Sequence, residues 1–226
     1  MEEIRVNNQT IYRFESEYVG TNMYLASSEN EALIVDPHPD DGALGLLAKE
    51  NVKNITVFLT HEHPDHTWGI PWLSARFDVC SFCSETAAKA IGNKKNNRPL
   101  TMALFISERD KKNGTNVLPR FLAEFGEYEC RADTTFGTET VFNWRENRFV
   151  FTPTPGHSKG SCCIKMNESA VFTGDSLIWN TPVITRFPGG SMKEFNEKTK
   201  PYLDALPDDI LVLAGHGRVF KMKEVR

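Results

Sequence analysis

Alternating and continuous runs of hydrophobic residues predict three regions along the chain. Residues 4–36 have the pattern of β-structure, with strands from Asn22 to Leu25 and from Ala32 to Val35 on either side of a polar turn. Residues 40–92 alternate between helical and strand patterns, with helices expected at about 41–50, 65–75 and 84–91 and strands at 55–59 and 77–80. Residues 133–220 return to strands, expected at 140–142, 149–152, 162–165, 170–172 and 210–214. This succession is typical of a layered α/β fold.

The stretch between 93 and 132 interrupts the pattern. It begins with polar residues, continues with an apolar run at 100–106, turns at Asn113-Gly114, and is helical in pattern again over 117–125. A segment of ~40 residues makes a poor independent core. We therefore predict a single domain over residues 1–226 with a helical insertion at about 93–132.

A capping pair marks the start of a late helix. Ser191 followed by Glu194 predicts that a helix begins there and runs over about 192–205. Pro201 lies inside this range and is expected to bend the helix or end it early.

Composition narrows the class of protein. The 226 residues carry 26 Lys and Arg against 30 Asp and Glu, a net charge of −4, which gives no general attraction to nucleic acid or to anionic lipid. No apolar run approaches the ~18 residues of a membrane span, and no secretory signal is evident. Five cysteines at low density fit a reducing compartment. We expect a cytoplasmic protein with a small-molecule substrate and neither a nucleic-acid nor a membrane partner. Its oligomeric state is not indicated.

Five of the six histidines fall where predicted strands end. His61-Glu62-His63-Pro64-Asp65-His66 directly follows the strand that ends at Thr60. Four other apolar strands end near an acidic residue or a histidine, namely Asp36, His157, Asp175 and His216. Buried strands of a layered fold deliver their last residues to one rim of the sheet, where ligands commonly bind.

This set of side chains predicts a metal site. Imidazole suits zinc, iron and similar divalent ions, and carboxylate oxygens complete or bridge the coordination shell. The ligands are too many for one tetrahedral ion and about right for two ions that share a carboxylate. Two metals about 3.5–4 Å apart can bind a bridging hydroxide and polarise the bond that it attacks. We expect two divalent ions, zinc first, with iron and manganese as alternatives.

The motifs resemble those of the metallo-β-lactamase-fold superfamily, and within it they are most similar to the glyoxalase II-like hydrolases. The motifs are Ile34-Val35-Asp36-Pro37, Thr60-His61-Glu62-His63-Pro64-Asp65-His66, Thr154-Pro155-Gly156-His157-Ser158, Phe172-Thr173-Gly174-Asp175-Ser176, Phe187-Pro188-Gly189-Gly190-Ser191 and Gly215-His216-Gly217. The resemblance implies a four-layer αββα sandwich of two mixed sheets flanked by helices. It also implies one metal on His61, His63 and His157, a second on Asp65, His66 and His216, and Asp175 as the bridging ligand.

Several residues beside these motifs have more than one interpretation. Asp36 is expected to orient a ligand histidine, with a turn-capping role as the alternative. His38, the one histidine outside the set, is expected on an exposed loop. Phe187 or Arg186 would touch the substrate if their loop lies at the site rim. The cysteines are expected to be structural, with Cys80 and Cys83 as buried thiols and Cys162-Cys163 as a strand pair.

Four functional hypotheses follow. The first is a dinuclear metal-dependent hydrolase that acts on a small ester, thioester or lactone through the bridging hydroxide, with Asp65 as a catalytic residue that orients the hydroxide or relays its proton. The second is a mononuclear-iron oxidoreductase like the persulfide dioxygenases, for which His61, His157 and Asp175 would suffice. The third is a phosphodiesterase of the same fold, and the fourth is a non-enzymatic metal site. The complete second set of ligands favours the first.

Overall fold

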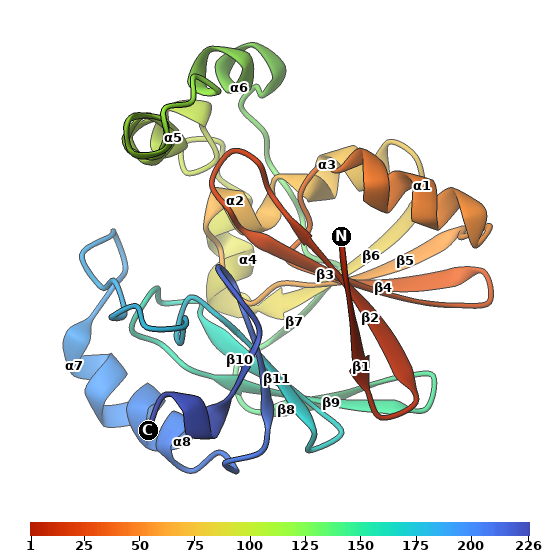
Figure 1. Ribbon diagram of the computed structural model, residues 1–226, viewed down its shortest axis with the longest axis vertical. Coiled ribbons are helices and arrows are strands. Elements are labelled where there is room, and N and C mark those ends of the chain that lie inside the picture. Colours follow the sequence, from red (N-terminus) through yellow and green to blue (C-terminus); the bar gives the residue numbers. More distant parts are fainter.

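The computed structural model describes residues 1–226, and two β-sheets form its centre (Figure 1). The seven-stranded sheet contains, in spatial order, β1 (Glu2–Val6), β2 (Gln9–Glu15), β3 (Asn22–Ser28), β4 (Glu31–Val35), β5 (Asn54–Phe58), β6 (Asp78–Ser84) and β7 (Thr134–Phe136). The six-stranded sheet contains β13 (Phe220–Lys221), β12 (Leu211–Ala214), β11 (Ala170–Gly174), β10 (Cys162–Met166), β9 (Asn147–Pro153) and β8 (Thr140–Trp144).

Both sheets are mixed. In the larger sheet β1 to β4 pair antiparallel and β4 to β7 pair parallel. In the smaller sheet only β11 and β12 pair parallel. The parallel strands therefore send their carboxyl ends to the same rim, where the predicted motifs begin.

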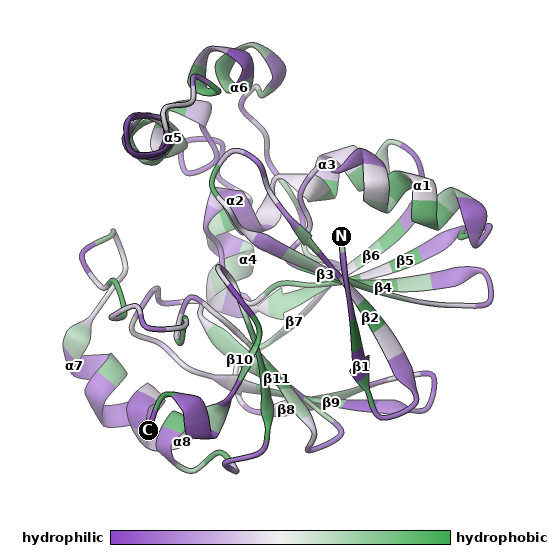
Figure 2. Ribbon diagram, viewed as in Figure 1, coloured by the Kyte–Doolittle hydropathy of each residue, from purple (hydrophilic) through white to green (hydrophobic).

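A hydrophobic core with many aromatic residues joins the inner faces of the two sheets. Phe58 of β5 lies at its centre, with its ring 5.1 Å from that of Phe149 and 4.8 Å from that of Phe151, both edge to face. Figure 2 shows hydrophobic residues along the strands of both sheets. Burial of these rings is the main force that holds the sheets together.

Helices cover the two outer faces. The larger sheet is covered by α1 (Asp41–Lys49), α3 (Gly69–Ser74) and α4 (Glu85–Ile91), and the short helix α2 (Pro64–Thr67) directly precedes α3. The smaller sheet is covered by α7 (Met192–Glu194), the π-helix η1 (Phe195–Thr199) and α8 (Lys200–Asp204), followed after β13 by the 3-10 helix η2 (Met222–Glu224). The expected αββα sandwich is thus confirmed.

Two helices of the 93–132 stretch form a lobe beside the sandwich: α5 (Pro99–Asn113) and α6 (Leu118–Glu124) (Figure 1). Asp110 is the last buried residue of α5. Its carboxylate accepts hydrogen bonds from the backbone N–H groups of Val117 and Leu118 at the start of α6. A cluster that contains Trp68 and Phe121 joins the lobe to the end of α2. The lobe is therefore built onto the segment that carries the histidine motif.

The late helix runs from Met192 to Asp204 in three successive segments, where the sequence predicted one helix that Pro201 would bend or end early. Ser191 caps it as predicted, since its hydroxyl accepts the N–H of Glu194. The turn before Pro201 widens into η1, which accommodates a residue that has no N–H to donate. None of the helices combines the length and apolarity needed to cross a membrane.

Candidate metal centre

The predicted site residues meet at one rim of the sandwich. His61, His63, Asp65 and His66 follow β5 on a short loop and α2, His157 follows β9, Asp175 follows β11, and His216 follows β12. Backbone hydrogen bonds join the two sheets at this rim, from Cys162 N–H to Thr60 O (2.8 Å) and from Asn22 N–H to Gly215 O (2.7 Å). The rim is thus a fixed frame, and all seven side chains are gathered on it.

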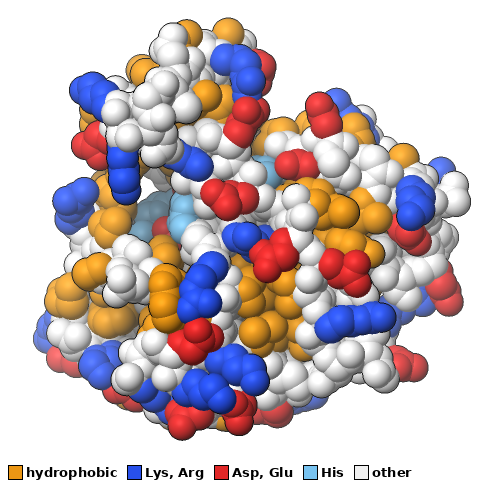
Figure 3. Space-filling model, viewed as in Figure 1, with side chains coloured by type: hydrophobic (Ala, Val, Ile, Leu, Met, Phe, Trp, Pro, Cys, Tyr) orange, Lys and Arg blue, Asp and Glu red, His pale blue; other side chains and the backbone are white.

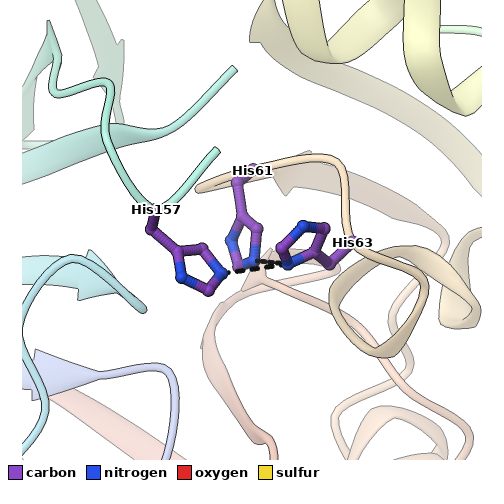
Figure 4. A group of neighbouring side chains, drawn as sticks. All are labelled: His61, His63 and His157. Atoms are coloured by element: carbon purple, nitrogen blue, oxygen red, sulfur yellow. Dashed lines mark hydrogen bonds between the residues drawn. The ribbon is translucent and has the colours of Figure 1, made fainter. Parts of the chain in front are cut away.

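His61, His63 and His157 form a three-histidine group (Figure 4). Nδ1 of His63 lies 3.1 Å from Nε2 of His61 and 2.9 Å from Nε2 of His157. Nδ1 of His157 lies 2.8 Å from the carbonyl oxygen of Ile184, which can only accept, so this nitrogen carries the proton. In the neutral ring the lone pair of His157 is therefore on Nε2, which lies toward His63.

Asp65, His66 and His216 form a second set of possible ligands, the Asp65 group. Oδ2 of Asp65 lies 3.5 Å from Nε2 of His66 and 3.3 Å from Nε2 of His216. The hydroxyl of Thr21 donates a 2.8 Å hydrogen bond to the same oxygen and fixes its position. Sequence patterns gave no indication of Thr21, because it lies just before β3, in an isolated β-bridge to His216, and reaches Asp65 only in the folded chain.

Asp175 lies between the two groups. Its Oδ2 is 3.5 Å from Nε2 of His157 in the three-histidine group and 3.5 Å from Nε2 of His216 in the Asp65 group. Its Oδ1 is 3.5 Å from Nε2 of His66. Gly215 makes this approach possible, because a Cβ atom there would collide with Oδ1 of Asp175.

The two groups differ in protonation. Burial, together with the neighbouring histidines, holds the pKa of His61 well below its ordinary value and lowers that of His63 to about 4. Burial also opposes a charge on His66, but Asp65, Asp36 and Asp175 outweigh it and raise the pKa of His66 to about 10. His61 and His63 are therefore neutral at pH 7, whereas His66 holds a proton among carboxylates.

Asp36 orients His66, as the sequence interpretation expected. Its Oδ2 accepts hydrogen bonds from Nδ1 of His66 (2.9 Å) and from the hydroxyl of Thr60 (2.6 Å), and its Oδ1 accepts the N–H of Thr60 (2.8 Å). Nδ1–H of His66 thus points to Asp36 and Nε2 points to Asp65 and Asp175. Partners of this kind fix the tautomer and orientation of metal-binding imidazoles.

The residues present fit divalent metal ions. Nε2 of His66 and Oδ1 of Asp175 are buried and have no hydrogen-bond partner, although buried polar atoms are almost always paired. The donors are imidazole nitrogens and carboxylate oxygens, the set that zinc and iron accept. A divalent cation would satisfy both orphaned atoms and offset the charge of the buried carboxylates.

Two expectations about nearby residues are wrong. His38 is 1% exposed, and its Nε2 lies 3.2 Å from the carbonyl oxygen of Phe14. The reason is the tight start of α3 at Gly69, whose N–H bonds to Pro37 O and draws this loop under the helix. Cys80 is exposed, whereas Cys83 is buried, because the first residues of β6 up to Cys80 are exposed or half-buried and the strand is buried on both faces only from Ser81 onward.

The loop before α7 lies at the rim, as the motif suggested. The ring of Phe187 is 5.8 Å from that of His63 and 6.3 Å from that of His157. Arg186 is exposed and lies over the Phe187 ring at 5.9 Å. The ring of Phe105, on α5, packs 5.2 Å from that of Phe187. No sequence signal identified Phe105, because nothing local shows which side of α5 faces the site.

Comparison with known proteins gives the family. A model of the metallo-beta-lactamase superfamily matches residues 17–216, so the chain belongs to that superfamily. An uncharacterized protein of Aquifex aeolicus is 26% identical over 200 residues, which cover 88% of this chain and 84% of that protein. Among solved structures, the BLEG-1 B3 metallo-beta-lactamase has a TM-score of 0.72 at 21% identity, covering 95% of both chains. TTHA1623 in a di-iron-bound form has a TM-score of 0.66 at 20% identity, covering 95% of this chain and 97% of that one.

Proposed function

We propose that the protein is a dinuclear metal-dependent hydrolase of the glyoxalase II-like branch, acting on a small ester, thioester or lactone. One observation carries the proposal: the carboxylate of Asp175 lies within 3.5 Å of a histidine nitrogen in each of the two groups. A carboxylate between two sets of three ligands is the arrangement that two ions sharing one bridging ligand require. That a structural neighbour is described as di-iron-bound supports the same count of ions.

In this proposal the ligands divide as the two groups do. His61, His63 and His157 would hold one ion, Asp65, His66 and His216 would hold the other, and Asp175 would be shared between them. The chemistry supplied by two bound divalent ions is the deprotonation of water at neutral pH and the polarisation of the carbonyl group under attack. Zinc is the proposed ion, and iron and manganese accept the same ligands.

The protein's own residues hold and orient the reacting groups. Asp65, besides acting as a ligand, is the proposed catalytic residue, because Thr21 holds its Oδ2 and leaves the carboxylate fixed at the centre of the site. There it can orient the attacking water and accept its proton. The Asp36–His66 hydrogen bond keeps Nε2 of His66 facing the same centre. No nucleophilic side chain is required, and the proposed partner is a small-molecule substrate.

Metal analysis tests the number of ions. Protein purified anaerobically is expected to contain close to two ions per chain, and Asp65→Ala is expected to contain close to one. Asp40→Asn is a matched control, because Asp40 only caps α1 by accepting the N–H of Ala43, which Asn does equally well. Fewer than one ion in the wild type, with the same value in Asp65→Ala, would refute the dinuclear site.

A hydrolysis panel on metal-assayed protein tests the reaction. S-lactoylglutathione, a homoserine lactone, nitrocefin and a bis-aryl phosphate represent the thioester, lactone, lactam and phosphodiester classes. We expect the thioester or the lactone to be cleaved fastest. Highest turnover of the bis-aryl phosphate would replace the proposal with a phosphodiesterase, and oxygen uptake with glutathione persulfide would replace it with the mononuclear-iron oxidoreductase.

A further inference from the structure

An aromatic side chain stands directly beside the three-histidine group. The ring of Phe187 is edge to face with that of His63, at 5.8 Å and 87°. Both Phe187 and its contact on α5, Phe105, are only partly buried. In Figure 3 histidine side chains are visible at the bottom of a hollow between the lobe of α5 and α6 and the rest of the molecule, with hydrophobic side chains beside them.

The position of Phe187 is fixed by the loop that carries it. The carbonyl oxygen of Phe187 accepts the N–H of Gly190 (2.8 Å), which closes a tight turn, and Ser191 N–H bonds to Gly156 O (2.8 Å). Ile184 of the same loop bonds through its carbonyl oxygen to Nδ1 of His157. The loop is therefore tied at both ends to the segment that carries His157, so Phe187 cannot move away from the site without breaking these bonds.

The insertion supplies the second half of this wall. Phe105 packs against Phe187 with ring centroids 5.2 Å apart and nearly perpendicular planes. On the other side Phe105 packs against the cluster that contains Trp68, Met102 and Ile106, and Trp68 directly follows α2. Phe105 thus packs against a cluster that includes a residue next to the histidine motif, and α5 and the Phe187 loop together border one side of the site.

We propose that Phe105 and Phe187 form a specificity wall for an apolar group of the substrate, next to the bond that is cleaved. The inference rests on the proposed hydrolase function, because it places the substrate at the three-histidine group. Two partly exposed rings offer apolar surface and no hydrogen bond, so they favour an alkyl or aryl group over a small or polar one. The preferred substrate is then an ester or thioester with a chain of several carbons on that side.

Two thioester series test the wall. One varies the acyl chain from acetyl to hexanoyl on N-acetylcysteamine, and the other varies the thiol from ethanethiol to hexanethiol on an acetyl group. In at least one series kcat/KM is expected to rise by about tenfold or more with chain length, the discrimination that buried methylenes give. Phe105→Ala and Phe187→Ala are each expected to reduce this ratio to about twofold. Leu104→Ala is the matched control, because Leu104 is adjacent on α5 but 74% exposed.

A binding measurement separates this inference from the proposed function. NMR titration with acetate and hexanoate requires no turnover, and hexanoate is expected to bind more tightly than acetate to the wild type but not to Phe105→Ala. If the protein hydrolyses none of the substrates but still binds hexanoate more tightly than acetate, the proposed hydrolase function is refuted and the wall of Phe105 and Phe187 is retained. Equal effects of Phe105→Ala and Phe187→Ala on short and long chains, in both turnover and binding, would overturn the wall.

Discussion

Replacement of Asp36 by asparagine is the sharpest test of how the site is held. Asp36 is 2% exposed and accepts three hydrogen bonds, two from Thr60 and one from Nδ1 of His66. Its φ of 53° lies in the left-handed region, which asparagine tolerates better than most residues. Asp36→Asn therefore preserves size and backbone and changes one oxygen acceptor into an NH2 donor.

The expected loss of metal affinity in Asp36→Asn follows from the hydrogen bonds that Asp36 makes. If the amide oxygen keeps the N–H of Thr60, the new NH2 group faces the hydroxyl of Thr60 and Nδ1 of His66. Nδ1 must then accept, so in the neutral ring that binds an ion the remaining proton lies on Nε2, and the lone pair needed toward Asp65 and Asp175 is lost. A hydrogen bond to a charged group contributes about 1.5–3 kcal/mol. Loss of such a partner lowers metal affinity about 10–100-fold, which agrees with that energy.

Competition with a chromogenic chelator measures the affinity of each ion separately. We expect Asp36→Asn to weaken the ion on Asp65, His66 and His216 by about 10–100-fold and to leave the other ion within about twofold. Asp40→Asn should change neither. Equal weakening of both ions, or no change in either, would show that the Asp36–His66 bond does not control the second group.

Three further predictions concern pH, the insertion and packing. The pKa of His66 is raised to about 10 and that of His216 is also raised, so both rings must lose a proton before an ion binds on Asp65, His66 and His216. The affinity for this ion should therefore rise by at least about tenfold per pH unit from about pH 6 to 9 in pH-corrected chelator competition. The pKa of His63 is lowered to about 4 and that of His61 lies well below its ordinary value, so the affinity of the three-histidine group should change less with pH. Equal slopes for the two ions would contradict this. Tyr128→Phe removes hydrogen bonds from the tyrosine hydroxyl to α2 and should lower the free energy of unfolding by about 1–2 kcal/mol in urea titration, and an unchanged midpoint would refute that support of α2. Gly215→Ala should displace Asp175 and lower kcat by about 100-fold, the cost of a misplacement near 1 Å, and full activity would show that the close approach of Gly215 to Asp175 is not required.

Much of the fold could be predicted because its signals are local. The strand that ends at Thr60 and the helix from Asp41 have patterns set by neighbouring residues, and the structure has β5 at Asn54–Phe58 and α1 at Asp41–Lys49. The same strand predicts that the His61–His66 motif lies at the rim of the sheet, since the chain leaves the sheet where a buried strand ends. The αββα layers came from the resemblance, because local patterns do not say how two sheets stack.

The sequence by itself determined which side chains are available: five histidines and several acidic residues, each placed after a strand. Only the tertiary structure decided how they meet. It set Asp175 between the two groups, tied His66 to Asp36 and Thr21 to Asp65, and buried His38 beneath α3. It also turned Phe105 of the insertion toward Phe187. These contacts join residues far apart in the chain, so they depend on loop paths and sheet packing that no local pattern encodes.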